Sequence, residues 1–384
     1  MKGPFVRYFM TEDGYFDYAA SAPPFPEALK RFEEVSLREF GNPSSSHAGG
    51  QEARKTLDAV RKAFLARTGF ADGTLVLTSG ATEANNLVIR GVLDANPDGR
   101  LVLAADAHPS AWFAKELYPK RTDILEPGPD GRIAADRPAA LLSRKTALVS
   151  ILHAGNETGV IQDVKALGAV CAKAGVKLHV DGVQALGRIP VTLSELPFSF
   201  YTFSAHKFGG PRGVGGVIIR DAALRAQIAG GGQEKGLRGG TENVAGLAAA
   251  LTALDLSTRS VETEGPRLRR LASLVADEIR ASIPGVLVNS SPDGVPGLVS
   301  VSVPDLIGEE IVVEMNLRGF AVSAGSACGS GRMEPSRPVM AMGRTRAQAL
   351  GTVRISMGRF TTEDAARRLA VALRQVVEKQ KALA

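Results

Sequence analysis

The sequence predicts an α/β fold in which helices cover both faces of a mostly parallel sheet. Short apolar runs alternate with stretches of helical periodicity between residues 74 and 219, and this alternation is typical of strand–helix–strand units. The runs are rich in Val, Leu and Ile, as expected of parallel strands buried on both faces. A long helical region then leads into a smaller α+β portion. We therefore expect a large α/β domain over 15–257 and a small α+β domain formed by 1–14 and 258–384.

Local signals place the individual elements. Gly41-Asn42-Pro43 stops the first periodic helix, and Ser79-Gly80 separates a short strand from the helix that follows it. The expected helices cover 27–39, 51–67, 110–117, 164–174, 242–283 and 308–317, with others starting near Thr82 and after Thr361. The expected strands cover 74–78, 101–104, 147–152, 176–180, 197–203 and 214–219, with others near Leu287 and Val299. Because ligands of such sheets bind beyond the carboxyl ends of the strands, polar residues that follow apolar runs are the first candidates for a site.

The composition is that of an ordinary globular enzyme. The 384 residues are 44% hydrophobic and 22% charged. The net charge is +6, but the basic residues are scattered among acidic ones and form no nucleic-acid-binding arm. Residues 1–14 lack an apolar signal core, and no run of about eighteen apolar residues occurs. We therefore expect a cytoplasmic protein that binds neither nucleic acid nor a membrane.

The two cysteines differ in their surroundings. Cys171 lies in the periodic segment 164–174 and shares its apolar face, which predicts inert packing in the core. Cys328 lies among glycines and serines. Two widely separated cysteines exclude a disulfide framework and a zinc knuckle, so no metal is expected.

Lys207 is the most informative candidate. It follows the apolar run 197–203 within Ser204-Ala205-His206-Lys207, and glycines come directly after it. A lysine at the end of a strand, partly desolvated beside another cation, loses basicity and can form a Schiff base with an aldehyde. A lone lysine would be read as an ordinary surface residue.

Two further features give Lys207 a context. Asp181 ends the strand 176–180, where a carboxylate can pair with a protonated pyridine nitrogen. The turn at 79–82 leads into a helix, so its free N–H groups and the helix dipole suit a phosphate. Each feature alone fits a simple turn or helix start. Together, the lysine, the carboxylate and the phosphate turn indicate pyridoxal 5′-phosphate.

Motifs along nearly the whole chain then identify a family. They are Asn42-Pro43-Ser44-Ser45, the stretch 78–86, Asn156-Glu157-Thr158-Gly159, the stretches 179–184, 204–207 and 238–243, Ser323-Ala324-Gly325-Ser326-Ala327-Cys328, and the stretch 354–359. In type and order they resemble the cysteine desulfurases of the nitrogen-fixation and housekeeping iron–sulfur type. This resemblance implies the class V aminotransferase fold, which is the fold type I of pyridoxal-phosphate enzymes. Its large domain binds the cofactor, and its small domain carries a catalytic cysteine loop.

The resemblance assigns roles to individual residues. It implies that Lys207 holds the cofactor as a Schiff base, that Asp181 pairs with the pyridine nitrogen and that Gln184 binds the ring oxygen. It makes His108 a catalytic residue stacked on the ring. The phosphate would be held by Ala81, Thr82, Ser204, His206 and Thr241 of the partner subunit, which implies a homodimer. Asn156 and Arg354 would bind the substrate carboxylate.

The activity that the resemblance implies is conversion of L-cysteine to L-alanine. Cys328 would take up the sulfur as a persulfide, for an iron–sulfur scaffold or another sulfur-acceptor protein. A class V transaminase, a selenocysteine lyase and a non-catalytic assembly protein remain as alternatives. The chain departs from the family pattern at Ala107, where glutamate is common before the histidine, and at Arg337-Pro338 after the cysteine loop.

Overall fold

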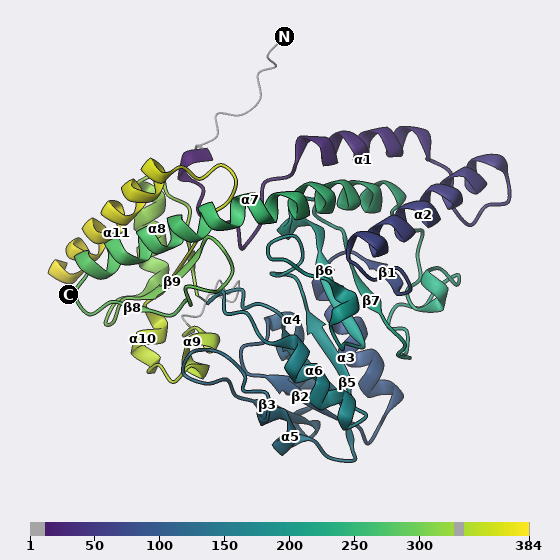
Figure 1. The fold of residues 1–384 in the computed structure, drawn as a ribbon, viewed down its shortest axis with the longest axis horizontal. Coiled ribbons are helices and arrows are strands. Elements are labelled where there is room, and N and C mark those ends of the chain that lie inside the picture. The colour runs from purple at the N-terminus through teal and green to yellow at the C-terminus, as the bar shows by residue number, and fades with distance from the viewer. Residues whose placement is uncertain (1–11, 326–333, 384) are drawn as a thin grey trace, which may run out of the picture. The chain divides into compact units, whose positions relative to one another are not determined.

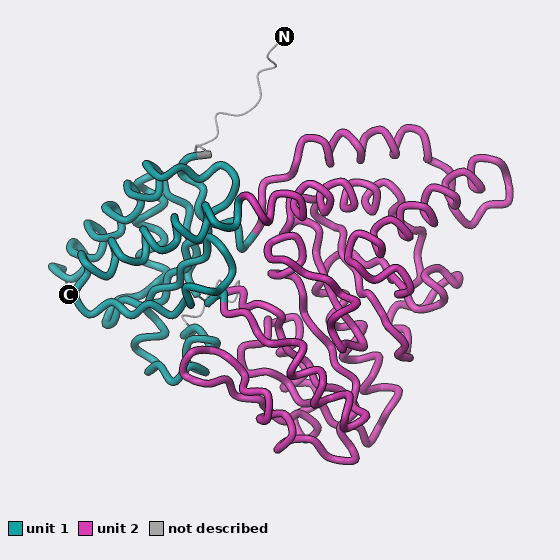
Figure 2. The backbone as a smooth tube through the Cα atoms, viewed as in Figure 1, with its two compact units in different colours: residues 1–20, 157–159, 264–384 teal, residues 21–156, 160–263 magenta. Residues whose placement is uncertain are grey.

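The computed structural model describes residues 12–325 and 334–383, and its chain forms two compact units. Unit 1 comprises residues 1–20, 157–159 and 264–384, and unit 2 comprises 21–156 and 160–263 (Figure 2). The boundary between 263 and 264 falls within a single helix, α7 (Val244–Ser282). Each unit has a sheet and a hydrophobic core of its own.

Unit 2 is built on a seven-stranded sheet in the order β1-β7-β6-β5-β4-β2-β3. Its strands are β1 (Thr74–Thr78), β2 (Arg100–Ala104), β3 (Thr122–Leu125), β4 (Thr146–Leu152), β5 (Lys177–Asp181), β6 (Phe200–Ser204) and β7 (Gly215–Ile219). Strand β7 runs antiparallel to both of its neighbours, β1 and β6, and the other four strand pairs are parallel. The prediction of a mostly parallel α/β sheet is confirmed.

Helices cover both faces of this sheet, as predicted (Figure 1). One face packs against α2 (Ala48–Arg67), α6 (Val164–Lys173) and the first part of α7. The other face packs against α3 (Ala81–Ala95) and α4 (Pro109–Leu117). The strands alternate between the two cores, because successive side chains of a strand point to opposite faces. The remaining helices of unit 2 include α1 (Pro26–Arg38) and the short α5 (Arg137–Leu141).

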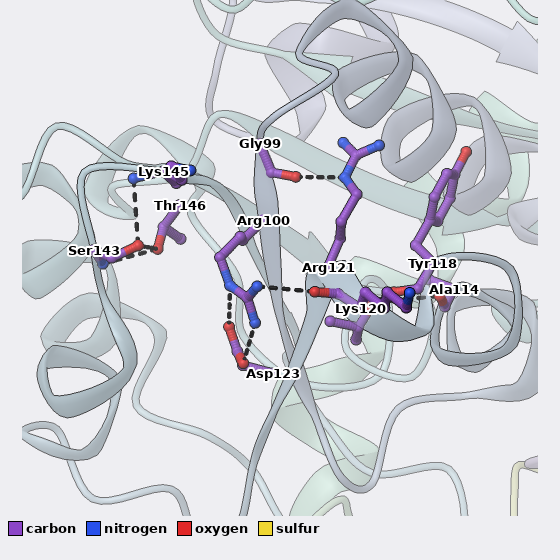
Figure 3. Close-up of polar contacts among 11 residues, drawn as sticks. Gly99, Arg100, Ala114, Tyr118, Lys120, Arg121, Asp123, Ser143, Lys145 and Thr146 are labelled. Atoms are coloured by element: carbon purple, nitrogen blue, oxygen red, sulfur yellow. Dashed lines mark hydrogen bonds and ion pairs between the residues drawn. The ribbon is translucent and has the colours of Figure 1, made fainter.

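An arginine joins the amino ends of β2 and of the edge strand β3. The guanidinium of Arg100, the first residue of β2, donates through Nε to Asp123 of β3 at 2.8 Å and through Nη1 to the carbonyl oxygen of Lys120 at 2.9 Å (Figure 3). Arg121 donates to the carbonyl oxygen of Gly99 at 2.8 Å in the same region. Strand β3 was not predicted, since it is short, half polar and shows no apolar run.

Unit 1 contains a four-stranded antiparallel sheet in the order β10-β11-β9-β8. Its strands are β8 (Leu287–Val288), β9 (Leu298–Ser302), β10 (Ser323–Ala324) and β11 (Thr352–Ser356), and its helices are α8 (Gly308–Leu317), α9 (Arg337–Ala341), α10 (Arg346–Leu350) and α11 (Glu363–Leu383). The second part of α7, α8 and α11 supply the helical side of its core. Within 12–325 and 334–383, every helix is too short or too polar to span a bilayer.

Two valines of α11 test the core of unit 1. Val376 is fully buried, whereas Val371 is 45% exposed. Val376→Ala should lower the free energy of unfolding by about 2 kcal/mol, because it removes buried apolar groups and leaves a cavity. Val371→Ala should change it by less than about 0.5 kcal/mol. Both substitutions alter helix propensity equally, so the difference between their urea unfolding midpoints reports packing, and equal midpoints would contradict the assigned core face.

Candidate active site

The parallel sheet of unit 2 brings the carboxyl ends of β1, β2, β4, β5 and β6 to one edge. The polar residues that follow or end these strands are, in the same order, Thr82, His108, Asn156, Asp181 and Ser204. Residues separated by up to 122 positions in the chain therefore meet at one edge of one sheet. Such an edge is where ligands of α/β proteins bind.

Asp181 is a buried carboxylate whose two oxygens both accept hydrogen bonds. Asn85 of α3 donates to its Oδ2 at 2.8 Å, and the backbone N–H of Val183 donates to its Oδ1 at 3.1 Å. Asn85 is fully buried and Asp181 is only 5% exposed. The carboxylate is thus held in one orientation at the end of β5, beside the end of β6, which pairs with β5 in parallel.

His108 lies directly before α4 and caps that helix. Its Nδ1 accepts the backbone N–H of Ser110 at 3.1 Å and lies 2.7 Å from the Ser110 hydroxyl oxygen. Pro109 occupies the first helical position, where a missing N–H costs nothing. Ala107, the residue that departs from the family pattern, is buried in the core below. The ring of His108 is therefore fixed through its own helix.

The turn between β1 and α3 is shaped for close approach. Gly80 is the N-cap of α3 and has no side chain to cap the helix, so the first-turn N–H groups are left for another acceptor. A Cβ atom on Gly215 of β7 would lie 2.6 Å from the Gly80 Cα, which requires glycine there. A Cβ atom on Gly80 would lie 3.7 Å from the hydroxyl of Ser204. Ser204 and the helix start are thus adjacent, and Ala81 and Thr82 begin α3 beside them.

Lys207 ends the short 3-10 helix Ala205–Lys207 that follows β6 and is half-buried. The neighbouring His206 ring lies 3.2 Å, Nδ1 to Oγ, from Ser21. Burial, and then the positive charges of Lys207 and Arg212, lower the pKa of His206 to about 4. His206 is therefore neutral at neutral pH. Two cations, Lys207 and Arg212, lie close enough to His206 to lower its pKa.

Gln184 is buried in the segment that follows β5. Its Oε1 accepts a hydrogen bond from the guanidinium of Arg188, one helical turn further along the chain. This contact orients the amide with its oxygen toward Arg188 and its nitrogen, which is a donor, on the other side. Arg188 is a positioning group that the sequence patterns did not single out.

Two ion pairs attach the glycine-rich segment 230–243 to the turn and to α2. Arg238 donates to Glu83 at 2.7 Å, and Glu83 also accepts the N–H of Ser79 in the turn at 2.8 Å. Burial alone would raise the pKa of Glu83, but the Arg238 and Ser79 hydrogen bonds lower it. Glu234 is paired with Arg61 at 2.6 Å. Thr241 itself is exposed.

The two expected substrate-binding residues belong to different units. Asn156 is in unit 2 and is half-buried. Arg354 lies in β11 of unit 1, is buried, and donates to Asp17 at 2.7 Å. Sequence reasoning did not anticipate this carboxylate, which holds the guanidinium in place.

Cys328 lies outside the described residues, but the two ends of its segment are described and lie side by side in unit 1. Gly325 donates its N–H to the carbonyl oxygen of Thr352, and a Cβ on Gly325 would come within 2.8 Å of the Ser336 Cβ. The Ser336 N–H donates to the carbonyl oxygen of Ala349, and its hydroxyl donates to Glu157 at 2.6 Å. We call this pair of anchored ends the loop stem.

The Arg337-Pro338 departure falls at the start of α9, where proline is well tolerated. Ser336 caps this helix by accepting the N–H of Val339 at 3.3 Å. The departure therefore fits the helix that begins after the loop stem.

Cys171 packs in the core of unit 2 and is 1% exposed, as predicted. Burial raises the pKa of its thiol to about 11. It remains protonated at neutral pH and is a poor nucleophile. Of the two cysteines in the sequence, Cys328 is thus the one left for thiolate chemistry.

The structure adds Asn85 and Ser110 to the site. Both lie inside helices and both are buried, at 0% and 7% exposure. Asn85 shares the buried face of α3 with Ala84 and Val88, so the available signal was a polar residue at an apolar helical position. Such a residue has to find a buried partner.

Comparisons with known proteins extend over both units. The aminotransferase class-V family model matches residues 14–369. The chain is 34% identical over 361 residues to the cysteine desulfurase IscS of Serratia proteamaculans, covering 91% of this chain and 89% of that protein. It is 32% identical over 378 residues to the cysteine desulfurase IscS of Dictyoglomus turgidum, covering 96% of each. A solved NifS-like protein matches with a TM-score of 0.87 and 28% identity, over 95% of this chain and 99% of that chain.

A buried histidine behind the site predicts how stability depends on pH. His153 follows β4, its Nδ1 lies 2.9 Å from the Tyr201 hydroxyl, and burial lowers its pKa from 6.5 to about 4. Between these two pH values the unfolded chain binds a proton that the folded protein does not, so this contribution to stability is lost as the pH falls.

His153→Gln removes that proton uptake. When the pH falls from about 7 to 5, the free energy of unfolding of the wild type should decrease by on the order of 1–2 kcal/mol more than that of the variant. Urea unfolding at the two pH values measures this difference, and comparison with the wild type cancels the contribution of all other groups. An identical pH dependence in both proteins would show that His153 is not buried as a neutral ring.

Proposed function

The chain belongs to the aminotransferase class-V family and, within it, to the cysteine desulfurases, and from this premise we propose that it converts L-cysteine to L-alanine and sulfane sulfur, using pyridoxal 5′-phosphate and Cys328. The family implies dependence on pyridoxal phosphate. The observation that carries the proposal is that Asp181 and the segment of Lys207 follow adjacent parallel strands at one sheet edge. The family match and the relatives confirm the resemblance to this family.

The residues at the sheet edge fit the cofactor in their chemistry. The uncapped start of α3, with Ala81, Thr82 and the nearby Ser204, offers donors to a phosphate. The buried carboxylate of Asp181 suits a protonated ring nitrogen, which needs an acceptor of opposite charge. Gln184, oriented by Arg188, would donate to the ring oxygen.

The amine of Lys207 would hold the cofactor covalently. Lys207 ends the short helix that follows β6, the strand paired with β5, so its amine would reach the sheet edge at which Asp181 lies. Bound there, pyridoxal phosphate would supply an electron sink for the carbon skeleton of the amino acid. His108, held by Ser110, would face the ring and move protons beside it.

Cys328 would receive the sulfur. Its thiolate attacks the sulfur atom of the substrate, the carbon–sulfur bond of cysteine breaks, and the carbon takes up a proton to give alanine. The enzyme keeps the sulfur as a Cys328 persulfide. The atoms of cysteine and the enzyme thiol equal those of alanine and the persulfide, so no oxidant is needed. Arg354, held by Asp17, and Asn156 would bind the carboxylate of the amino acid.

The proposal extends to the quaternary structure and to the sulfur acceptor. The exposure of Thr241, beside the buried Glu242, supports a phosphate contact made to a partner subunit in a homodimer. The persulfide sulfur would then pass to an acceptor protein, such as an iron–sulfur scaffold.

Persulfide formation tests the activity directly. Enzyme incubated with L-cysteine should release one alanine for each sulfur that cyanide removes from the protein as thiocyanate. Cys328→Ala should lose this protein-bound sulfur and reduce alanine formation by at least about a hundred-fold, whereas Cys171→Ala should retain both. A keto acid in place of alanine would indicate a transaminase, and undiminished protein-bound sulfur in Cys328→Ala would contradict the proposal.

Cofactor attachment is a separate test. Borohydride reduction followed by peptide mass spectrometry should place the cofactor on Lys207, and Lys207→Ala should carry no covalent adduct. Asp181→Asn should bind pyridoxal phosphate more weakly by about a hundred-fold, since it removes one partner of a buried charge pair. An adduct on another lysine would overturn the assignment of this sheet edge.

A further inference from the structure

The face of the unit 2 sheet that packs on α3 carries a row of polar side chains. Ser150 of β4, His179 and Asp181 of β5, and Thr202 of β6 alternate with residues of the opposite face, and each is at most 5% exposed. Ser150 and His179 are register partners, as are Asp181 and Thr202. Buried polar groups are costly unless hydrogen-bonded, so the hydrogen positions in this row follow from matching its donors with its acceptors.

Asn85 connects the row to α3. Its amide nitrogen donates to Asp181 Oδ2 at 2.8 Å and to Ser110 Oγ at 2.9 Å, and its Oδ1 accepts the Thr202 hydroxyl at 2.7 Å. A carboxylate only accepts hydrogen bonds, which fixes the amide with its nitrogen toward Asp181. A single amide therefore restrains three groups at once.

The same matching fixes His179. Thr202 gives its only hydrogen to Asn85, so its oxygen accepts from His179 Nε2 at 3.3 Å. His179 Nδ1 then accepts the Ser150 hydroxyl at 2.9 Å. Burial lowers the pKa of His179 to about 4, in keeping with a neutral ring that carries one hydrogen. Each group in the series Ser150, His179, Thr202 thus donates its hydrogen to the next, and the last donates to Asn85.

Ser110 carries this direction to His108. The amide nitrogen of Asn85 can only donate, so the Ser110 hydroxyl oxygen accepts its hydrogen bond. The hydrogen of the same hydroxyl is then donated to His108 Nδ1 at 2.7 Å. The backbone N–H of Ser110 points at the same Nδ1 at 3.1 Å. A hydrogen on Nδ1 would meet this N–H directly, so the ring hydrogen belongs on Nε2.

We propose that Asn85 and Ser110 are positioning residues that set the tautomer of His108 and the orientation of Asp181 together. Asn85 holds the Asp181 carboxylate with one N–H and, through the other, orients Ser110 so that His108 is kept as the Nε2–H form. His108 consequently offers a hydrogen-bond donor at Nε2, while Nδ1 is occupied. The two ends of the cofactor site are coupled through one side chain.

This inference rests on the proposed function for the catalytic and cofactor-binding roles of His108 and Asp181. The hydrogen bonds themselves are formed by the protein without the cofactor. It can therefore be tested on the cofactor-free protein as well as on the holoenzyme. A failure of pyridoxal phosphate binding and a failure of the tautomer assignment give different observations.

The tautomer is measured by nitrogen NMR of protein labelled with ¹⁵N-histidine, at a pH where the rings are neutral. The sequence has five histidines, and the His108→Gln spectrum identifies the resonances of His108. We expect a protonated Nε2 and an unprotonated Nδ1 at His108 in the wild-type protein, with and without pyridoxal phosphate. A wild-type His108 that carries its hydrogen on Nδ1 overturns the proposal, whether or not any variant folds.

Ser110→Ala tests the relay. Loss of the hydroxyl should bring the two nitrogen shifts of His108 closer together, because both tautomers become populated. Ser257→Ala is the matched control, since Ser257 is also a buried helical serine whose hydroxyl bonds only to the carbonyl oxygen of Leu254 among the hydrogen bonds described for it. Unchanged His108 shifts in Ser110→Ala would contradict the relay, and so would an equal change in Ser257→Ala.

Asn85→Asp tests the coupling to Asp181. It keeps the size of the side chain but sets a carboxylate against the Asp181 carboxylate. The dissociation constant of pyridoxal phosphate, measured by equilibrium dialysis, should rise at least about ten-fold. Asn96→Asp makes the same change at the exposed end of α3, where the amide bonds to the Val92 carbonyl, and should leave the constant nearly unchanged.

The outcomes separate the two proposals. A wild type that binds no pyridoxal phosphate contradicts the proposed function, and the NMR result still decides the tautomer. A wild type that binds the cofactor and forms persulfide, yet tolerates Asn85→Asp without loss of cofactor affinity, overturns the coupling alone.

Discussion

The hydrogen bond from the Asn85 amide to the Asp181 carboxylate is the contact on which the arrangement of this site depends. A carboxylate at the end of a buried strand loses its hydration, and without donors it would be neutralised or displaced. Asn85 supplies the donor from α3, and the Val183 N–H supplies the second from the chain itself. The helix that starts at the Ser79-Gly80 turn is thereby tied to the strand that ends in the carboxylate. Neither can shift without unpairing a buried polar group, which costs about 1–3 kcal/mol.

The general fold follows from short-range patterns. The apolar runs of β1, β2, β4, β5, β6 and β7 and the periodicity of the long helices were sufficient to predict a mostly parallel α/β sheet. The elements missed are β3, β10, β11, α5, α9 and α10, most of which are short or polar. Strands β3 and β10 are made regular by pairing with β2 and β11. A local pattern cannot carry that information.

The residues of the site were predictable to the extent that they follow strands. Asp181, His108 and Lys207 could be singled out because a strand end or a motif marks them. Their supporting groups were not singled out, because Asn85 acts from a helix interior and Asp17 reaches Arg354 across 337 positions of sequence. Such partners become neighbours only when the sheet has assembled. Sequence reasoning thus identifies reactive side chains more readily than the residues that position them.

The loop stem has an evolutionary consequence. Gly325 donates its backbone N–H to Thr352 of β11, and Ser336 bonds to Glu157 and to Ala349 of α10. A Cβ atom on Gly325 would come within 3.0 Å of the side chains of Ser336 and Thr352, so this position admits no larger residue unless one of them moves. Selection on these two anchors is therefore exerted through the sheet and the helices that they join, and not through a local preference of the chain.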